Sequence, residues 1–261
     1  MIINCKEIAQ KWKNECSGKN ASLAIIQVGN NPASNSYIKG KIKDCEEVGF
    51  VAKLFKYNEN VSESFILSVI DALNENDTID GIIVQLPLPK HINPQNIAKA
   101  ILPEKDVDGF ISTSPFTQCT PLGVINLLDE LNIDLNGKFV VVLGRSENVG
   151  KKAADLCLEQ NATVCICHSK TPIETRNNLL KTADIIISAV GSPNLFSWEN
   201  VKEGAIVIDI GINRLDNRLC GDFTHHPDND DYCDYTPVPG GIGLLTRAML
   251  LKNTLLAHEL K

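Results

Sequence analysis

The chain has 261 residues, a formal net charge of −7, 43% apolar residues and 22% charged residues. This length can bury the core of one large or two modest domains, and the composition is that of a soluble globular protein. The negative charge argues against a surface for nucleic acid, and no uninterrupted apolar run reaches the length of a membrane span. We therefore expect neither nucleic acid nor a membrane among its partners.

The cysteines indicate a reducing compartment. The chain has 9 of them, an odd number, without a Cys-x-x-Cys spacing, and residues 1–6 do not resemble a secretion signal. This pattern predicts free thiols and a cytoplasmic location. Cys165 and Cys167 alternate along a predicted strand, and we interpret them as small apolar residues, with metal binding as the weaker alternative.

Strands and helices alternate from the first strand onward, which predicts a parallel α/β architecture. In the first half, Ser34 is expected to cap a helix that ends at Gly49, in the usual glycine position. The predicted strands there are 23–28, 51–57 and 81–86, and the predicted helices are 34–49, 62–76 and 93–102.

The alternation restarts after an irregular stretch at residues 110–121. The predicted strands of the second half are nearly continuous apolar runs, as expected where helices cover both faces of a sheet. They are 139–143, 163–167, 184–190 and 205–210, and the predicted helices are 122–131, 149–160 and 244–260. We place a domain boundary near residue 120.

A glycine turn joins strand 139–143 to the following helix and predicts a dinucleotide site. The turn reads Gly144, Arg145, Ser146 and, four residues later, Gly150. Such a turn presents backbone N–H groups and a positive helix end to a pyrophosphate. The spacing is not G-x-G-x-x-G, so an ordinary strand-to-helix turn remains the alternative.

The end of the next strand favours NADP over NAD. An NAD site usually has an acidic residue there for the ribose hydroxyls, but this chain has His168, Ser169 and Lys170. With Arg145, these side chains are suited to a ribose phosphate. Taken singly, Lys170 is better interpreted as a solvated loop lysine and His168 as a strand-end histidine; only together with Arg145 do they favour a phosphate.

Two further strand ends are predicted to contact the cofactor. Ala189, Val190 and Gly191 end one strand, and Ile212 follows the next. Ligands of open parallel sheets bind at the carboxyl ends of the strands. A glycine after a strand is also common in any α/β protein, so this prediction depends on the preceding turn.

Tyr37 and Lys41 are the candidate pair for proton transfer. Their i, i+4 spacing places them one turn apart on one helical face. Burial lowers the pKa of a lysine readily, although a packed tyrosine and a solvated lysine are the ordinary interpretation. Gln85 lies in an apolar strand, where an unpaired amide costs about 1–3 kcal/mol, so it needs a partner.

Several stretches together carry a family resemblance. They run in one order along nearly the whole chain: 28–41, 80–89, 103–110, 119–123, 144–146, 167–169, 209–213 and 236–243. On these stretches the chain resembles the bifunctional methylenetetrahydrofolate dehydrogenase/methenyltetrahydrofolate cyclohydrolase family. The resemblance implies an N-terminal α/β catalytic domain, residues 1–120 with the last helix at 244–261. It also implies a C-terminal Rossmann-like parallel-sheet NAD(P)-binding domain, residues 121–243, with a cleft between the two.

The resemblance implies NADP-dependent oxidation of 5,10-methylenetetrahydrofolate, hydrolysis of the methenyl product to 10-formyltetrahydrofolate, and a homodimer. It assigns the water step to Lys41 as base or proton shuttle. Gln85 would set the position of Lys41, and Tyr37 would stack near the folate. Asp108 would accept hydrogen bonds from the pterin, whereas Asp106 is expected to be structural. The loop with Pro237, Gly240 and Gly241 would line the cleft.

Some features depart from the family pattern. The loop after Phe110 is shorter by roughly ten residues, a size typical of a functional surface loop. The alternatives are therefore a dehydrogenase with weak or absent cyclohydrolase activity, or a catalytically silent nucleotide-binding relative. A shikimate dehydrogenase type would share the architecture but not the motifs at 85–89 and 237–241. Residues 222–231 combine two histidines with acids; we expect a polar surface loop, with a metal site as the alternative.

Overall fold

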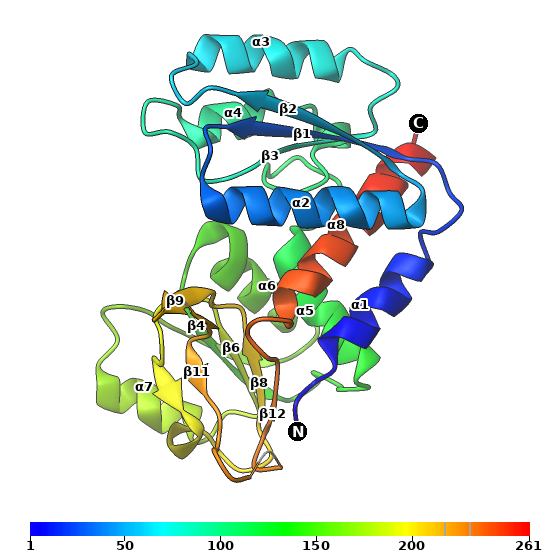
Figure 1. Ribbon diagram of the computed structural model, residues 1–261. Coiled ribbons are helices and arrows are strands. Elements are labelled where there is room, and N and C mark those ends of the chain that lie inside the picture. Colours follow the sequence, from blue (N-terminus) through cyan, green and yellow to red (C-terminus); the bar gives the residue numbers. More distant parts are fainter. Residues whose placement is uncertain (217, 230) are drawn as a thin grey trace. The chain divides into compact units, whose positions relative to one another are not determined.

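The computed structural model describes residues 1–216, 218–229 and 231–261, which divide by backbone contacts into two compact units. The first, here called the three-stranded unit, comprises residues 10–119 and 247–261. The second, the five-stranded unit, comprises residues 1–9 and 120–246. Both are parallel α/β structures (Figure 1).

The three-stranded unit is built on a parallel sheet with the order β2-β1-β3. The central strand β1 is buried along its whole length, whereas the edge strand β2 is half exposed. Helices α2 and α3 lie on opposite faces of this sheet in Figure 1. The elements are β1 (Ser22–Val28), α2 (Pro32–Val48), β2 (Val51–Tyr57), α3 (Glu63–Asn74), β3 (Gly81–Val84), α4 (Pro94–Ala100) and the 3-10 turn η1 (Pro103–Lys105).

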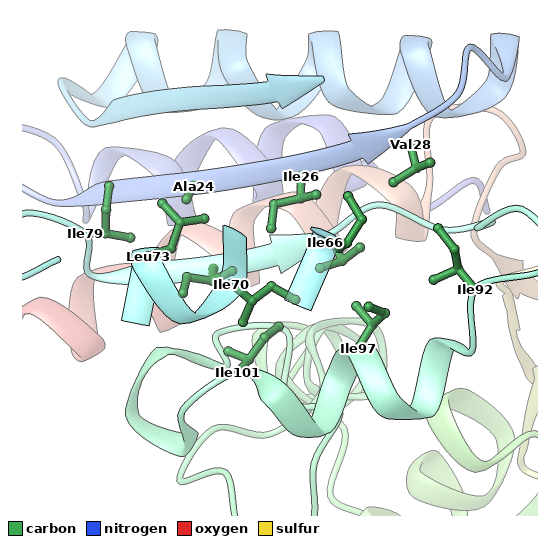
Figure 2. Packing of buried hydrophobic residues seen from close by; sticks show 12 residues of the cluster. Ala24, Ile26, Val28, Ile66, Ile70, Leu73, Ile79, Ile92, Ile97 and Ile101 are labelled. Atoms are coloured by element: carbon green, nitrogen blue, oxygen red, sulfur yellow. The ribbon is translucent and has the colours of Figure 1, made fainter. Parts of the chain in front are cut away.

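Aliphatic side chains from β1, α3 and α4 form the core under this sheet (Figure 2). Ile26, Ile66 and Ile70 are completely buried, and Ile97 lies against them from α4. Burying one such side chain stabilises the fold by about 1.5–3 kcal/mol. Branched aliphatic residues therefore compensate for the scarcity of aromatics in the chain.

Helix α2 begins two residues before the predicted start. Asn31, not Ser34, is its N-cap: the Asn31 side chain accepts hydrogen bonds from the backbone N–H groups of Ala33 and Ser34. Pro32 then suits the first helical position, because its ring presets a helical φ and it has no N–H to satisfy. Ser34 is buried, and its hydroxyl donates to the Leu86 carbonyl at 3.1 Å. The end of the helix is as predicted, with Gly49 at φ 89°.

The five-stranded unit has a parallel sheet with the order β12-β8-β6-β4-β5. The chain passes from β4 to one neighbour, β5, and then back to the other, β6, so the order reverses at β4. The strands are β4 (Phe139–Leu143), β5 (Thr163–Cys167), β6 (Ile185–Ser188), β8 (Ile206–Asp209) and β12 (Asp234–Tyr235). A crevice at the carboxyl end of such a reversal is where ligands of open α/β sheets bind.

The remaining elements are short or join the units. In the five-stranded unit they are α5 (Cys119–Glu130), the π turn η2 (Glu147–Lys151), α6 (Lys152–Glu159), α7 (Ile173–Leu180), β7 (Phe196–Ser197), η3 (Trp198–Asn200), β9 (Asn213–Leu215), β10 (Arg218–Cys220) and β11 (Phe223–Thr224). Helix α1 (Cys5–Asn14) and the last helix α8 (Ile242–Glu259) contain residues of both units. No helix among the described residues is long and apolar enough to cross a membrane.

Several element boundaries differ from the prediction. Strands β6 and β8 are each shorter, because the residues beyond them turn to form loops at the sheet edge. Helix α5 begins at Cys119, three residues before the predicted start at Leu122. Helices α1 and α7 were not predicted. α1 buries Cys5, Ala9 and Trp12 at helical spacing, whereas the largely polar sequence of α7 gives a weak signal.

Candidate functional site

Lys41 and Gln85 meet in the three-stranded unit. Lys41 lies on α2, and Gln85 follows the last residue of β3. The Lys41 Nζ donates a hydrogen bond to Gln85 Oε1 at 3.1 Å. The amide of Gln85 also donates to the Leu86 carbonyl at 2.9 Å, and its backbone N–H donates to Ile26. The amide is therefore held at both ends, and its oxygen fixes the position of the Lys41 Nζ.

Tyr37 lies on the same face of α2, and a neighbouring arginine faces it. Burial raises the pKa of Tyr37, and the positive charge of Arg247 opposes part of that rise. The Arg247 Nε is 2.8 Å from a carboxylate oxygen of Asp44, a residue that is buried on α2. This contact is an ion pair without a hydrogen bond, because the Nε–H is not directed at the oxygen.

Gly40 makes room for this arginine. A Cβ added at Gly40 would lie 1.9 Å from Arg247 Nη1, so the guanidinium crosses α2 where a side chain is missing. Asp44 also pairs with Lys13 Nζ at 3.3 Å. The helix face with Tyr37 and Lys41 is thus bordered by a fixed positive charge.

Asp108 is half-buried and acts on the same buried thiol as Lys41. The thiol of Cys119 reports this arrangement: burial and then the charge of Asp108 raise its pKa well above the usual value, while the charge of Lys41 opposes them. Both groups therefore lie within electrostatic reach of one buried sulfur atom. Asn253 of α8 holds the segment that carries Asp108, residues 107–117, by donating to the carbonyls of Val107, at 2.8 Å, and Thr117, at 3.0 Å.

Lys105 and Asp106, the two residues before the segment 107–117, stabilise the fold. Asp106 is buried and accepts a hydrogen bond from the Ile111 backbone, and burial raises its pKa to about 6. The Lys105 ammonium donates to the carbonyls of Leu73, Asn74 and Asn76 at the end of α3. Neither side chain is free to bind a ligand in this arrangement.

A second site lies in the five-stranded unit, where the strand order reverses. It is a pocket of about 480 Å³ at the carboxyl ends of β4, β5 and β6. Of the predicted cofactor residues, it brings together Gly144, Arg145, Ser146, His168, Ser169, Ala189 and Val190. Gly150, Lys170, Gly191 and Ile212 are not in its lining.

Two glycines of the turn are required by the backbone. Gly144 has φ 107°, and a Cβ added there would lie 2.6 Å from the Ala189 carbonyl oxygen. A Cβ at Gly150 would lie 2.3 Å from the Gly144 oxygen. The turn therefore packs tightly on itself and on the residue that follows β6, and Ser146 Oγ accepts a hydrogen bond from the Gly150 N–H at 3.3 Å. A side chain at Gly144 would clash with Ala189, and one at Gly150 would clash within the turn.

The positive groups of this pocket differ from those predicted. Arg176 of α7 lines it, although the sequence interpretation did not include this residue, because α7 itself was not predicted. The guanidinium donates to Asn177 Oδ1 at 3.0 Å and lies close enough to Cys167 to affect its pKa. Lys170 does not line the pocket, but its backbone N–H donates a hydrogen bond at 3.1 Å to Nδ1 of His168, which does.

The loop at residues 236–241 is shaped by its glycines. Gly240 has φ 99°, and a Cβ at Gly241 would lie 2.3 Å from the Pro237 carbonyl oxygen. Thr236 is buried at the start of the loop, and its hydroxyl accepts a hydrogen bond from the Asp209 N–H at 2.8 Å. The conformation of this loop therefore depends on its glycines and on one buried threonine.

The acidic segment at residues 222–231 differs from the expected surface loop at its first residue, because Asp222 is completely buried. His225 stacks on Tyr235 and His226 contacts Trp198. Among the residues that the structure describes, no group of three or more potential ligands could hold a metal ion, and Asp230 lies outside them.

Comparisons with known proteins place both halves of the chain in one family. The catalytic-domain model of tetrahydrofolate dehydrogenase/cyclohydrolase matches residues 3–108, and the NAD(P)-binding-domain model matches residues 118–261. The bifunctional protein FolD of Bacillus cereus (strain AH187) is 46% identical over 277 residues, covering 97% of this chain and 95% of the relative.

Solved structures give the same result. The bifunctional FolD enzyme of Campylobacter jejuni has a TM-score of 0.93 at 40% identity, with 99% of this chain and 98% of that chain covered. The Trypanosoma brucei enzyme, solved with NADP and an inhibitor, has a TM-score of 0.93 at 31% identity, with 99% and 97% covered. A Listeria monocytogenes shikimate dehydrogenase, at 13% identity and a TM-score of 0.52 over 91% and 92% of the two chains, shares only the fold. The chain belongs to the tetrahydrofolate dehydrogenase/cyclohydrolase family.

Proposed function

We propose that this chain oxidises 5,10-methylenetetrahydrofolate to 5,10-methenyltetrahydrofolate with NADP and hydrolyses the product to 10-formyltetrahydrofolate. The observation that carries the proposal is the hydrogen bond from Lys41 to Gln85, close to Asp108. The family match over both domains supports it, as do relatives named as bifunctional enzymes. The half-buried Tyr37 on the same helical face would stack near the folate.

The cofactor fits the pocket of the five-stranded unit. When bound, NADP accepts the hydride that leaves the methylene carbon. Gly144 and Ser146 would hold the pyrophosphate. At Gly144 only a residue without a side chain fits the tight turn, so the backbone can approach the phosphates closely. Arg145, His168 and Ser169 would bind the ribose phosphate, and we add Arg176 to this set, because an arginine fork matches phosphate oxygens. Residues 189–191 and Ile212 would contact the rest of the dinucleotide.

In the water step, Lys41 acts at the carbon that has become electron-poor. Loss of hydride leaves a cationic folate, so the neutral amine is the form that can approach it and accept a proton from the attacking water. Gln85 holds the amine by its oxygen. The proton passes from Lys41 to the ring nitrogen as the carbon–nitrogen bond breaks. The hydroxyl group of the adduct loses its own proton to solvent as the formyl C=O forms, so one proton is released overall and Lys41 is neutral again. Asp108 accepts hydrogen bonds from the pterin N–H groups and fixes the orientation of the ring.

The remaining parts of the proposal concern position and assembly. Pro237, Gly240 and Gly241 would line the substrate site. The folate-binding residues Tyr37, Lys41, Gln85 and Asp108 belong to the three-stranded unit, whereas the NADP residues belong to the five-stranded unit. The homodimer and the cytoplasmic location stay predictions.

The experiment that tests the function follows two absorbance signals in the purified protein, reduced NADP and the methenyl product. Wild-type protein should reduce NADP with methylenetetrahydrofolate and then clear the methenyl signal. Lys41→Ala should abolish the clearance, because the proton acceptor is missing. Lys39→Ala, which removes an exposed lysine from the same helix, should behave as wild type.

The other results separate the alternatives. Reduction of NADP without decay of the methenyl signal would identify a monofunctional dehydrogenase, the alternative suggested by the short loop after Phe110. No reduction with either NADP or NAD would contradict the proposed activity and leave a silent nucleotide-binding relative.

A further inference from the structure

A buried carboxylate lies beneath the loops that leave two neighbouring strands of the five-stranded unit. Asp222, between β10 and β11, is 0% exposed, and its partners come from the end of β6, the loop after it and the start of β9. One oxygen accepts hydrogen bonds from Ser188 Oγ at 2.8 Å, Val190 N at 2.9 Å and Gly191 N at 3.2 Å; the other accepts from Ser192 N at 2.8 Å and Asn213 Nδ2 at 3.0 Å.

A second carboxylate interlocks with the first. Asp209, the last residue of β8, accepts hydrogen bonds from the backbone N–H groups of Gly211, at 2.9 Å, and Phe223, at 2.8 Å. A Cβ at Gly211 would lie 2.1 Å from Asp222 Oδ1, and one at Gly221 would lie 1.9 Å from Asp209 Oδ2. The two acids and two glycines therefore tie the loops after β6 and β8 to the segment at 221–223.

This arrangement decides what the two loops can present to a ligand. The backbone N–H groups of residues 190–192 are directed inward to Asp222, so they are used within the protein. The large apolar side chains of Val190 and Ile212 are 46% and 47% exposed, and Val190 lines the pocket. Apolar side chains held on fixed loops suit contact with a flat ring.

We propose that Asp222 is a positioning residue for the dinucleotide. Its carboxylate holds the loop at 190–192 and Asn213 in the arrangement that presents Val190 and Ile212 to NADP. The inference rests on the proposed function, since it deepens the cofactor site without adding a new ligand. Five donors converge on one carboxylate, and a carboxylate is the side chain with enough acceptor sites on two oxygens to satisfy them.

The test compares NADP binding with an activity that needs no cofactor. Asp222→Asn keeps the shape but replaces one oxygen with an N–H₂ group, which faces backbone N–H donors and cannot accept from them. We expect the dissociation constant for NADP, measured by calorimetry, to rise about tenfold or more, because a charge-assisted hydrogen bond is lost. The Michaelis constant for NADP should rise in parallel. Hydrolysis of added methenyltetrahydrofolate should stay within about twofold of wild type.

A matched substitution at the other end of the same strand controls for loss of stability. Asp184 precedes β6, accepts a hydrogen bond from Phe139 N at 2.8 Å and pairs with Lys202. Asp184→Asn should lower the melting temperature and leave the NADP dissociation constant unchanged. Ser188→Ala removes one donor of Asp222 and should weaken NADP binding about two- to fivefold. It is the variant to use if Asp222→Asn does not fold.

The results distinguish this inference from the function on which it rests. Wild-type protein that fails to bind NADP would overturn the proposed function and this inference together. Wild type that binds NADP, with Asp222→Asn and Ser188→Ala binding it equally well, would overturn the positioning role alone. An equal fall in cofactor affinity and in hydrolysis of methenyltetrahydrofolate would also overturn it, because the acid would then support the fold in general.

Discussion

At the residue scale, Gly40 and Arg247 show how a missing side chain shapes the face of α2 that carries Tyr37 and Lys41. The guanidinium occupies the space of the absent Cβ and pairs there with the buried Asp44. In an ordinary helix, replacing glycine with alanine stabilises by about 1 kcal/mol. Here the added methyl group displaces the arginine from its carboxylate.

We therefore expect Gly40→Ala to lower the free energy of unfolding by about 1–3 kcal/mol, because it breaks an ion pair of a buried acid. In an Arg247→Ala background, the same substitution should raise it by about 1 kcal/mol. Urea denaturation of the four proteins in this double-mutant cycle gives both values. Equal effects of Gly40→Ala in the two backgrounds would contradict the contact.

Two arginines lie in the pocket at the carboxyl ends of β4, β5 and β6, the proposed NADP site. Arg145 and Arg176 both line it. Arg145→Ala or Arg176→Ala should raise the Michaelis constant for NADP about tenfold and change that for NAD little, because only NADP carries the extra phosphate. Lys170→Ala is the control, since its side chain is not in the pocket lining. An equal effect on both cofactors would argue against a phosphate contact.

At the element scale, α8 controls the segment that carries Asp108. Asn253 is 5% exposed and donates to two carbonyl groups of that segment, Val107 and Thr117. The Val107 carbonyl also accepts from the Cys119 thiol at 3.4 Å, so Asn253 is the amide donor that ties the two carbonyls together. The last helix thereby positions residues that lie far from it in sequence.

Asn253→Ala should lower the free energy of unfolding by about 1–3 kcal/mol, because the Thr117 carbonyl loses its amide donor and the Val107 carbonyl keeps only the weak thiol donor of Cys119. It should also raise the Michaelis constant for the folate, since Asp108 loses its support. Thermal denaturation and steady-state kinetics measure the two effects. Asn96→Ala, which removes an exposed amide from α4, should produce neither. A folate constant that does not move in Asn253→Ala would show that α8 only stabilises the unit.

At the scale of the whole molecule, each unit contains one buried acid whose pKa is raised to about 6. They are Asp106 and Asp209, and burial is the main cause for both. In the folded chain, each of these two acids therefore takes up a proton near pH 6, whereas in the unfolded chain each does so near pH 4. More protons on the folded state between these values mean that stability rises as the pH falls from 7 to 5.

We expect a gain of about 1–3 kcal/mol per acid over this range, measured by urea denaturation at several pH values. Acids whose pKa is lowered, such as Asp80 and Asp184, act in the opposite direction only near pH 4 and below. Asp209→Asn should remove its share of the slope. A slope that is unchanged in this variant would contradict the assigned pKa.

The elements predicted most accurately from sequence are those with local signals. Strands β2, β4 and β5 begin and end as predicted, because runs of apolar residues are bounded by turn residues. Gln85 was expected to need a partner from its apolar surroundings alone. Arg176 was missed, because its helix lacks a clear apolar face. Its place in the pocket lining depends on residues from β4, β5 and β6 that are distant from it in sequence.

The sequence by itself determined the α/β class, the order of the elements and the family, because these depend on periodicity and on motifs within short stretches. Only the tertiary structure decided that Asp222 is a buried anchor and not a surface acid, and that Arg247 lies over Gly40. The reason is physical: the surroundings of these side chains come from residues distant in the chain. Burial and pairing arise only where strand ends and helix faces meet.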